Sequence, residues 1–222
     1  VIDLSGLGLD QIEETEDAFV IGAMVTLRQI ECSEALAQYL NGAARESVRH
    51  IVGVQFRNLA TVGGSLYGRY GFSDVLTLFL ALGAKVRLYH AGEVELADYV
   101  DQKPDRDVLE AVILPKKVEG CSYQCIRNSE TDFPVLTCCM AKVDGVYQGT
   151  IGARPGRAVL FRDENGLLKD GITGESAAAF ADYVRTHVVT GSNYRAGAEY
   201  RRKMAGVLTK RALMAIEEGG LN

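Results

Sequence analysis

Two adjacent glycines, Gly63 and Gly64, constrain this chain more than any other local feature. A glycine has no Cβ, so it can take a positive φ and let a ligand approach its main chain closely. The hydroxyl groups of Thr61 and Ser65, on either side, can donate hydrogen bonds to an anion. The sequence TVGGS, which includes Val62, therefore predicts a turn that holds a phosphate group. A tight turn between a strand and a loop, without a ligand, would use the same residues.

A helix is predicted shortly after this turn, over residues 73–82. Ser73 is a typical capping residue, the body is apolar, and Gly83 is a typical stop. Asp74 falls in the first helical turn, where a carboxylate interacts favourably with the helix dipole.

Three stretches resemble the medium, FAD-binding subunit of the molybdenum hydroxylases, the family of xanthine dehydrogenase and carbon monoxide dehydrogenase. The family's second flavin-binding signature is similar to RNLATVGGSLYG...SDVLTLFLALGAKV. Two further segments, in the expected order, are VIDLSGLGLDQIEE...FVIGAMVTLRQIE upstream and TGSNYRAGAEYRRKMAGVLTKRAL near the end. The resemblance therefore covers nearly the whole chain.

The resemblance implies a set of residues that bind FAD. Asp74 would accept hydrogen bonds from the ribityl or phosphate-adjacent hydroxyl groups of the flavin, a role compatible with its place at the helix dipole. Ile51 falls where relatives place an apolar side chain against the flavin ring, although core burial explains an isoleucine equally well. Leu109 matches a position that contacts the cofactor through its main chain, but burial in a strand is the simpler interpretation. The complete expected set is Thr61, Val62, Gly63, Gly64, Ser65, Asp74, Ile51 and Leu109.

The resemblance also implies an activity shared among several chains. Electrons taken from a substrate on a molybdopterin-binding large subunit would pass through iron-sulfur clusters on another subunit to FAD on this chain. NAD or another acceptor would then receive them. A flavin suits this task because it can accept single electrons and deliver a hydride, while the protein supplies orientation and electrostatics. No residue of this chain is needed as a general acid or base.

Two other functions stay open. The first is a flavoprotein of the related vanillyl-alcohol oxidase class that acts on its own substrate, although the chain shows no substrate-binding domain and no histidine placed to tether the flavin. A second alternative is an assembly module that has lost FAD and only bridges partner subunits.

We expect an α+β fold with two domains. Residues 1–116 would form an FAD-binding domain of the type found in vanillyl-alcohol oxidase-like flavoproteins, and residues 117–222 an antiparallel sheet with helices. Relatives carry an earlier glycine-rich flavin-binding segment before the equivalent of Val1. The N-terminal part of the domain is therefore expected to be missing, and these residues alone are expected to bind FAD poorly.

Local patterns predict the individual elements. Thr26 and Gln29 form a capping box that opens a helix with apolar positions as far as Leu40. Asp144-Gly145, between two apolar runs, predicts a hairpin. Helices are expected over 176–187 and 197–217. Alternating or apolar runs predict strands over 19–24, 85–89, 108–114, 121–127, 135–143, 146–153 and 158–161.

Charge and hydropathy argue against binding to nucleic acid or to a membrane. The formal net charge is −5, which disfavours a nucleic-acid or anionic-membrane surface. The cluster Arg201-Arg202-Lys203 is interpreted as the solvated face of a helix. No apolar run approaches the ~20 residues of a membrane span, and no signal peptide is visible. A cytoplasmic protein is expected.

No metal site is expected in this chain. Its five cysteines lack the paired C-x-x-C spacing of zinc and iron-sulfur sites, so most are interpreted as buried thiols. His50 is a lone histidine with no partner close in sequence, which favours a structural role. The cysteines are Cys32, Cys121, Cys125, Cys138 and Cys139.

Overall fold

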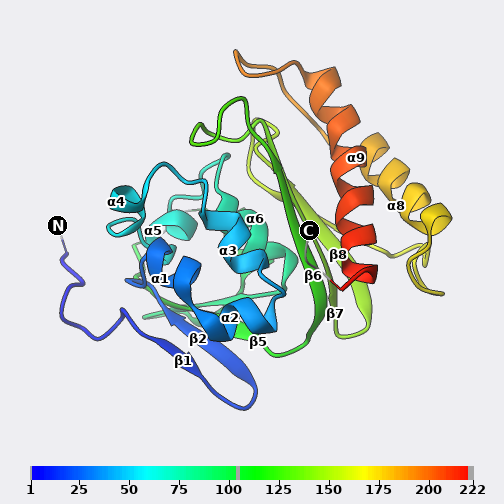
Figure 1. The fold of residues 1–222 in the computed structure, drawn as a ribbon. Coiled ribbons are helices and arrows are strands. Elements are labelled where there is room, and N and C mark those ends of the chain that lie inside the picture. The colour runs from blue at the N-terminus through cyan, green and yellow to red at the C-terminus, as the bar shows by residue number, and fades with distance from the viewer. Residues whose placement is uncertain (1, 104–105, 220–222) are drawn as a thin grey trace.

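The computed structural model describes residues 2–103 and 106–219, which form two antiparallel sheets and the helices around them (Figure 1). The first sheet has the strand order β1-β2-β5-β3-β4 and the second has the order β6-β7-β8-β9. This mixed architecture confirms the α+β fold expected from the sequence. The strands are β1 (Ile12–Glu14), β2 (Ala18–Gly22), β3 (Lys85–Leu88), β4 (Gly92–Glu95), β5 (Leu109–Pro115), β6 (Val118–Ile126), β7 (Leu136–Val143), β8 (Val146–Gly152) and β9 (Val159–Arg162).

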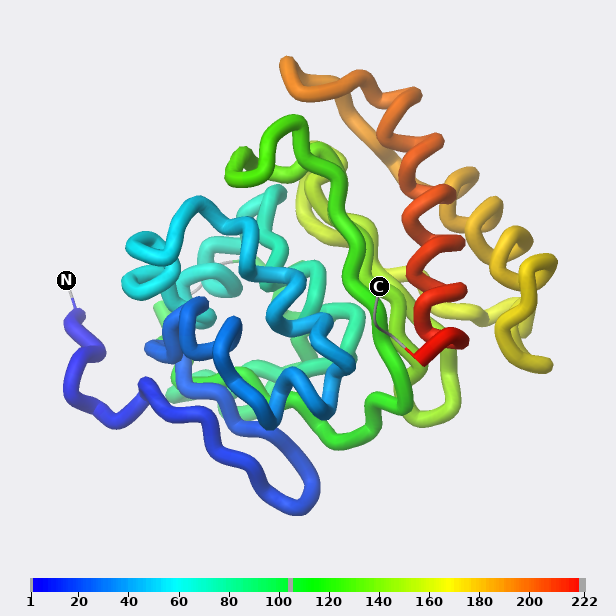
Figure 2. Tube along the Cα trace, in the orientation of Figure 1, coloured from blue at the N-terminus to red at the C-terminus, as the bar shows by residue number. Residues whose placement is uncertain are grey.

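The helices form two layers, one between the sheets and one outside. Helices α3 and α6 contact the inner face of the second sheet, and α5 contacts the first sheet. Helices α8 and α9 pack together on the outer face of the second sheet, on the side away from the first (Figure 2). The helices are α1 (Leu27–Cys32), α2 (Glu34–Tyr39), α3 (Ala43–Val48), α4 (Val54–Arg57), α5 (Val62–Tyr67), α6 (Asp74–Ala81), α7 (Leu96–Asp101), α8 (Gly174–His187) and α9 (Ala198–Glu217).

Strand β7 separates two hydrophobic cores. Successive side chains of a strand point to opposite faces. Cys138 and Met140 accordingly join the outer core under α8 and α9, whereas Cys139 and Ala141 join the inner core. The inner core also contains side chains of the first sheet and of α6. The second sheet therefore contributes to both cores.

The chain passes from the first sheet to the second through a short connection. Strand β5 ends at Pro115, and β6 begins at Val118. The hydroxyl of Tyr39 donates to the carbonyl oxygen of Pro115 at 3.3 Å and accepts from the N–H of Val118 at 2.9 Å. The domain boundary at residues 116–117 stays a prediction, because the inner core contains side chains from both sides of it.

Most of the longer predicted elements are confirmed, with one helix divided. The capping box of Thr26 and Gln29 is present. The helix ends at Cys32, however, because Ser33 takes an extended conformation and caps α2. The Asp144-Gly145 hairpin is also confirmed, with positive φ at both residues as a type I′ turn requires. The sequence patterns did not predict β1, β4, α4 and α7, all of which are short.

Arg201 corrects the interpretation of the basic cluster. Its side chain is fully buried, whereas Arg202 and Lys203 are exposed. Helical spacing places Arg201 on the same face as Ala205 and Leu208, which belong to the outer core. Its guanidinium is hydrogen-bonded to three backbone carbonyls and to one side-chain amide oxygen. These acceptors are the carbonyls of Val135, Gly191 and Ala196 and the Oδ1 atom of Asn193.

The cysteines differ sharply in their surroundings. All five are free thiols, and only Cys32 is exposed. Burial raises the pKa of Cys121 and Cys138 to about 12 and that of Cys139 well above its ordinary value. Within residues 2–103 and 106–219, no three or more His, Cys, Asp or Glu side chains lie close enough to hold a metal ion. Over the same residues, no helix has the length and hydropathy needed to cross a membrane.

This difference predicts the thiol chemistry of the native protein. Because the thiolate is the reactive species, Cys32 is expected to react quickly with a disulfide reagent and the three buried thiols only after unfolding. Titration of native and denatured protein would count the reactive groups. A Cys32→Ser variant should lose the fast phase. A fast phase that persists in this variant would mean that another thiol opens readily to solvent.

Candidate functional site

The glycine pair lies at the start of a helix and not in a turn. Gly63 and Gly64 are in the first turn of α5, whose N-cap is Thr61, and neither glycine has a positive φ. Their N–H groups already have partners within the protein. Gly63 donates to the carbonyl oxygen of Ala23 at 2.9 Å, and Gly64 donates to Thr61 Oγ1 at 3.1 Å. The predicted turn is therefore wrong, because these residues begin a helix and neither glycine has a positive φ.

The two glycines are needed for different reasons. A Cβ on Gly63 would lie only 2.6 Å from the carbonyl oxygen of Ala23 and 2.7 Å from its Cβ, so this position needs glycine for close packing. A Cβ on Gly64 would meet only Thr61 Oγ1, at 3.2 Å. Gly63 is buried, whereas Gly64 is exposed. Because Gly64 has no side chain, the surface at this position is open.

That open surface adjoins two cavities. The main cavity has a volume of about 460 Å³, and its walls include Ile51, Phe56, Thr61, Gly64, Asp74 and Phe133. The side cavity, of about 450 Å³, is lined by Gly63 and Leu109 as well as by Thr61 and Gly64. Thr61 and Gly64 border both, so the start of α5 separates the two hollows.

The structure brings together most of the residues predicted to bind a cofactor. Ser65 joins Ile51, Thr61, Gly64 and Asp74 on the main cavity. Val62 lines neither cavity, since its side chain is fully buried and its N–H donates to the carbonyl oxygen of Val25. The remaining two, Gly63 and Leu109, lie on the side cavity.

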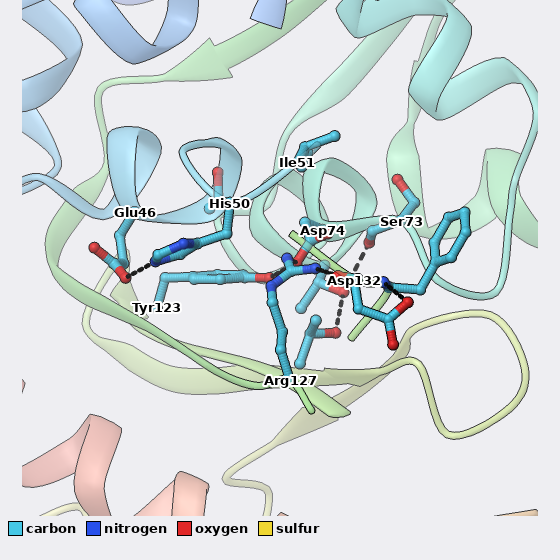
Figure 3. A network of polar contacts seen from close by, with 12 residues as sticks. Glu46, His50, Ile51, Ser73, Asp74, Tyr123, Arg127 and Asp132 are labelled. Carbon is cyan, nitrogen blue, oxygen red and sulfur yellow. Dashed lines mark hydrogen bonds and ion pairs between the residues drawn. The ribbon is translucent and has the colours of Figure 1, made fainter. Parts of the chain in front are cut away.

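Asp74 is the centre of a buried polar network (Figure 3). Its Oδ1 atom accepts hydrogen bonds from the hydroxyl of Tyr123 and from Arg127 Nη2, both at 2.6 Å. The side chains of Asp74 and Arg127 are 5% and 7% exposed. No side chain of the described part of the chain donates to Asp74 Oδ2. One carboxylate oxygen is therefore fixed, and the other is left as an acceptor beside the main cavity.

Burial and charge act in opposite directions on this network. Burial raises the pKa of the Asp74 carboxyl, and the charge of Arg127 together with the hydrogen bond from Tyr123 opposes this rise. Although burial also disfavours the charged guanidinium, attraction to Asp74 raises the pKa of Arg127. Burial and the neighbouring carboxylate raise the pKa of Tyr123 well above its ordinary value. Tyr123 therefore stays a hydrogen-bond donor to Asp74.

The loop after β6 covers one side of the main cavity. Arg127 Nη1 donates to the carbonyl oxygen of Asp132 at 2.6 Å, and the carboxylate of Asp132 pairs with Arg195. The ring of Phe133 meets Phe72 edge-on, with 4.5 Å between centroids. Contacts with Arg127, Arg195 and Phe72 therefore hold this loop over the cavity.

Several wall residues were not predicted from the sequence. Tyr70, Phe72 and Phe133 give the cavity an aromatic rim. The sequence did offer a signal for two of them, because the aromatic run Tyr70-Gly71-Phe72 lies between the glycine pair and α6. Tyr123 had none, because its role depends on a contact with Asp74 across 49 positions of sequence.

His50 lies between two carboxylates, and the structural role expected for it stays a prediction. Its ring nitrogens lie 3.8 Å from Glu46 and 3.6 Å from Glu130. It lies beside the network of Asp74 in Figure 3 without bonding to it.

Comparison with known proteins identifies the family. The family described as the FAD binding domain in molybdopterin dehydrogenase matches residues 1–117. The chain belongs to this family. The resemblance to the flavin subunit of the molybdenum hydroxylases, first seen in the sequence, is thereby confirmed.

Two related proteins match over 96% of this chain. The nicotine 6-hydroxylase medium subunit of Paenarthrobacter nicotinovorans is 26% identical, over 96% of this chain and 81% of the relative. The carbon monoxide dehydrogenase medium chain of Afipia carboxidovorans is 27% identical, over 96% and 80%. The fold matches quinoline 2-oxidoreductase from Pseudomonas putida 86 with a TM-score of 0.82, at 21% identity, over 95% of this chain and 79% of that one.

The residues of the main cavity fit a flavin. A flavin presents an aromatic ring system and a hydroxylated ribityl chain. The cavity offers apolar and aromatic walls from Ile51 and Phe133, and an acceptor oxygen on Asp74. Gly64, which has no side chain, borders both cavities. The walls of the main cavity thus suit the flavin ring and the ribityl chain, whereas the N–H groups of Gly63 and Gly64 and the hydroxyl of Ser65 are bonded within the protein.

Proposed function

We propose that this chain is the FAD-carrying medium subunit of a molybdenum hydroxylase of the xanthine dehydrogenase-like type. The observation that carries the proposal is the main cavity. It unites Ile51, Thr61, Gly64, Ser65 and Asp74, which are dispersed in the sequence, on one surface of a chain that belongs to an FAD-binding family.

Each part of the site has a proposed task in holding the cofactor. Ile51 packs against the flavin ring, and Asp74 Oδ2 accepts a hydrogen bond from a ribityl hydroxyl. Gly64 and Thr61 line the passage taken by the pyrophosphate, while Leu109 contacts the cofactor through its main chain in the side cavity. Val62, which lines neither cavity, supports the site through its buried packing.

The chemistry is supplied by the cofactor and the partners. Bound FAD would accept electrons from iron-sulfur clusters on one partner chain and deliver them to NAD or another acceptor. A molybdopterin-binding large subunit would oxidise the substrate. The names of the two relatives support this division of labour, because both are medium subunits of larger enzymes. The cytoplasmic location expected from the sequence stays a prediction.

The proposal predicts which reactions the purified, complete natural polypeptide performs by itself. It is expected to be yellow with bound FAD and to reduce a dye with NADH, since that reaction needs only the flavin. It is expected to oxidise no purine, aldehyde or carbon monoxide, because the molybdopterin centre and the iron-sulfur clusters would be on partners. Flavin absorption and the two kinds of turnover assay measure these outcomes.

The alternatives give different results in the same assays. Substrate-dependent turnover by the single chain would favour a stand-alone flavin oxidase. A colourless protein that still co-purifies with partner subunits would favour an assembly module. NADH-dependent dye reduction by the yellow protein, without substrate turnover, supports the proposed subunit.

A further inference from the structure

Val52 adopts a backbone conformation that valine rarely takes. Its φ is +50°, in the left-handed region, where a β-branched side chain is an outlier. The residue lies between α3 and α4, and its side chain lines the main cavity beside Ile51. Strained residues of this kind persist only where the surrounding structure holds them in place.

The side chain of Arg57 is bonded to the peptide group that precedes Val52. Its Nη1 atom donates to the carbonyl oxygen of Ile51 at 3.1 Å. This carbonyl belongs to the planar peptide group that ends at the nitrogen of Val52. The chain after Val52 is also held, because Gly53 is the N-cap of α4 and its carbonyl oxygen accepts from the N–H of Arg57. With both sides fixed, rotation about the N–Cα bond of Val52, which is φ, is limited.

The guanidinium is itself fixed by Glu31 on α1. Arg57 Nε donates to Glu31 Oε2 at 2.8 Å, and Nη2 donates to Oε1 at 3.2 Å. Such bidentate pairs have a defined geometry. Their side chains are only 6% and 9% exposed. Burial works against ionisation of Glu31, but the hydrogen bonds from Arg57 and Arg28 lower its pKa below the ordinary value.

Arg28 provides a natural comparison. It also pairs with Glu31, at 2.9 Å, but its side chain is 41% exposed. Glu31 is the only ion-pair partner of Arg28 within the described residues, and Arg28 makes no bond to the turn at Ile51 and Val52. Both arginines share one carboxylate, and only Arg57 connects it to the wall of the cavity.

We propose that Arg57 is a positioning residue for the cofactor. By fixing the Ile51 carbonyl against the carboxylate of Glu31, it holds Val52 in the left-handed conformation. The side chains of Ile51 and Val52 then form one continuous wall of the main cavity. The inference rests on the proposed function, because the group that this wall contacts is the flavin ring of FAD.

The first test compares Arg57→Lys with Arg28→Met in the complete natural polypeptide. Lysine keeps the charge facing Glu31, but its single ammonium cannot reproduce the planar fork that reaches carboxylate and carbonyl together. In Arg57→Lys, the Kd for FAD is expected to rise about tenfold or more, with a shift in the absorption bands of the bound flavin. In Arg28→Met, the Kd is expected to change by less than about threefold, as for an exposed ion pair.

The second test is a rescue. Asparagine adopts the left-handed conformation far more readily than valine. Val52→Asn therefore removes most of the strain against which Arg57 holds residue 52. Added to Arg57→Lys, it is expected to restore the Kd to within about threefold of the Val52→Asn single variant. Thermal melts of every variant report folding separately from binding.

The outcomes separate this inference from the function on which it rests. If Arg57→Lys binds FAD normally, or if Val52→Asn fails to rescue it, Arg57 does not position the cofactor. If Arg57→Lys unfolds, Val52→Asn must restore both folding and binding for the proposal to stand. If the unsubstituted complete polypeptide binds no FAD, the proposed function fails and the positioning role with it.

Discussion

Replacement of Gly64 by valine in the complete natural polypeptide is expected to weaken FAD binding by about tenfold to a hundredfold and to leave the fold intact. The added Cβ would meet only Thr61 Oγ1, at 3.2 Å, so the helix can accept it. The two methyl groups beyond it would occupy the space between the main and side cavities. Overpacking of this kind costs about 1–3 kcal/mol, and each ~1.4 kcal/mol is a factor of ten in affinity.

Gly63 supplies the matched control. A Cβ there would lie 2.6 Å from a backbone oxygen of Ala23 and could not be relieved by a rotamer change. Gly63→Ala is therefore expected to lower the thermal midpoint, whereas Gly64→Val lowers the affinity with little change in the midpoint. FAD titrations and melts of both variants measure the two effects. Normal FAD affinity in Gly64→Val would show that no part of the cofactor passes over this glycine.

Replacement of Arg127 by methionine is expected to lower the free energy of unfolding by about 3–5 kcal/mol near neutral pH. Removing one member of a buried ion pair leaves the other charge without compensation. Here the remaining charge would be Asp74, which is 4% exposed and would keep only Tyr123 as a side-chain donor. Urea unfolding at constant pH measures the loss.

The loss of unfolding free energy in Arg127→Met is expected to become smaller at acid pH. Burial raises the pKa of Asp74 in the folded chain, and Arg127 is the charge that opposes this rise. When the folded-state pKa lies above the unfolded-state value, stability falls as pH rises through the folded-state pKa and is fully present below the unfolded one. The Arg127→Met variant should therefore recover stability as pH falls towards 3.8, the ordinary value for aspartate.

A double variant tests the coupling. Adding Asp74→Asn to Arg127→Met removes both charges, so the pair should be less destabilised than the sum of the single variants. Asp74→Asn alone is expected to be costly, because it leaves the guanidinium of Arg127 buried beside a neutral group. Additive losses would show that the two side chains do not stabilise each other.

The predictions that succeeded from sequence depend on neighbouring residues. Helix α6 has its cap at Ser73 and its stop at Gly83 within a few positions of its apolar body. The Asp144-Gly145 hairpin is likewise a local pattern. Ser65 and Asp74, both predicted to bind FAD, line the same cavity, because a single short loop joins their helices.

The predictions that failed depend on contacts that are distant in sequence. A pair of glycines is compatible with a turn or with a helix start, and the contact of Gly63 with Ala23 decides between them. Arg201 looks solvated in a basic cluster until the loop that supplies its carbonyl acceptors is folded around it. The partners of Asp74 are 49 and 53 positions away, on β6 and on the loop that follows it. Sequence periodicity holds no information about such pairings.

The hydroxyl of Tyr39 bonds on both sides of the connection between the two sheets. These bonds affect how a ligand can enter and leave the site. A cleft enzyme usually opens by bending at the segment that joins its halves. In this chain that segment is fastened at Pro115 and Val118 by one tyrosine, and the inner core crosses it. These contacts oppose rigid-body opening, so we expect exchange of the cofactor to proceed by movement of the loop that carries Asp132 and Phe133, which lines the main cavity. The release rate of FAD would then be set by that loop, and not by the joint between the sheets.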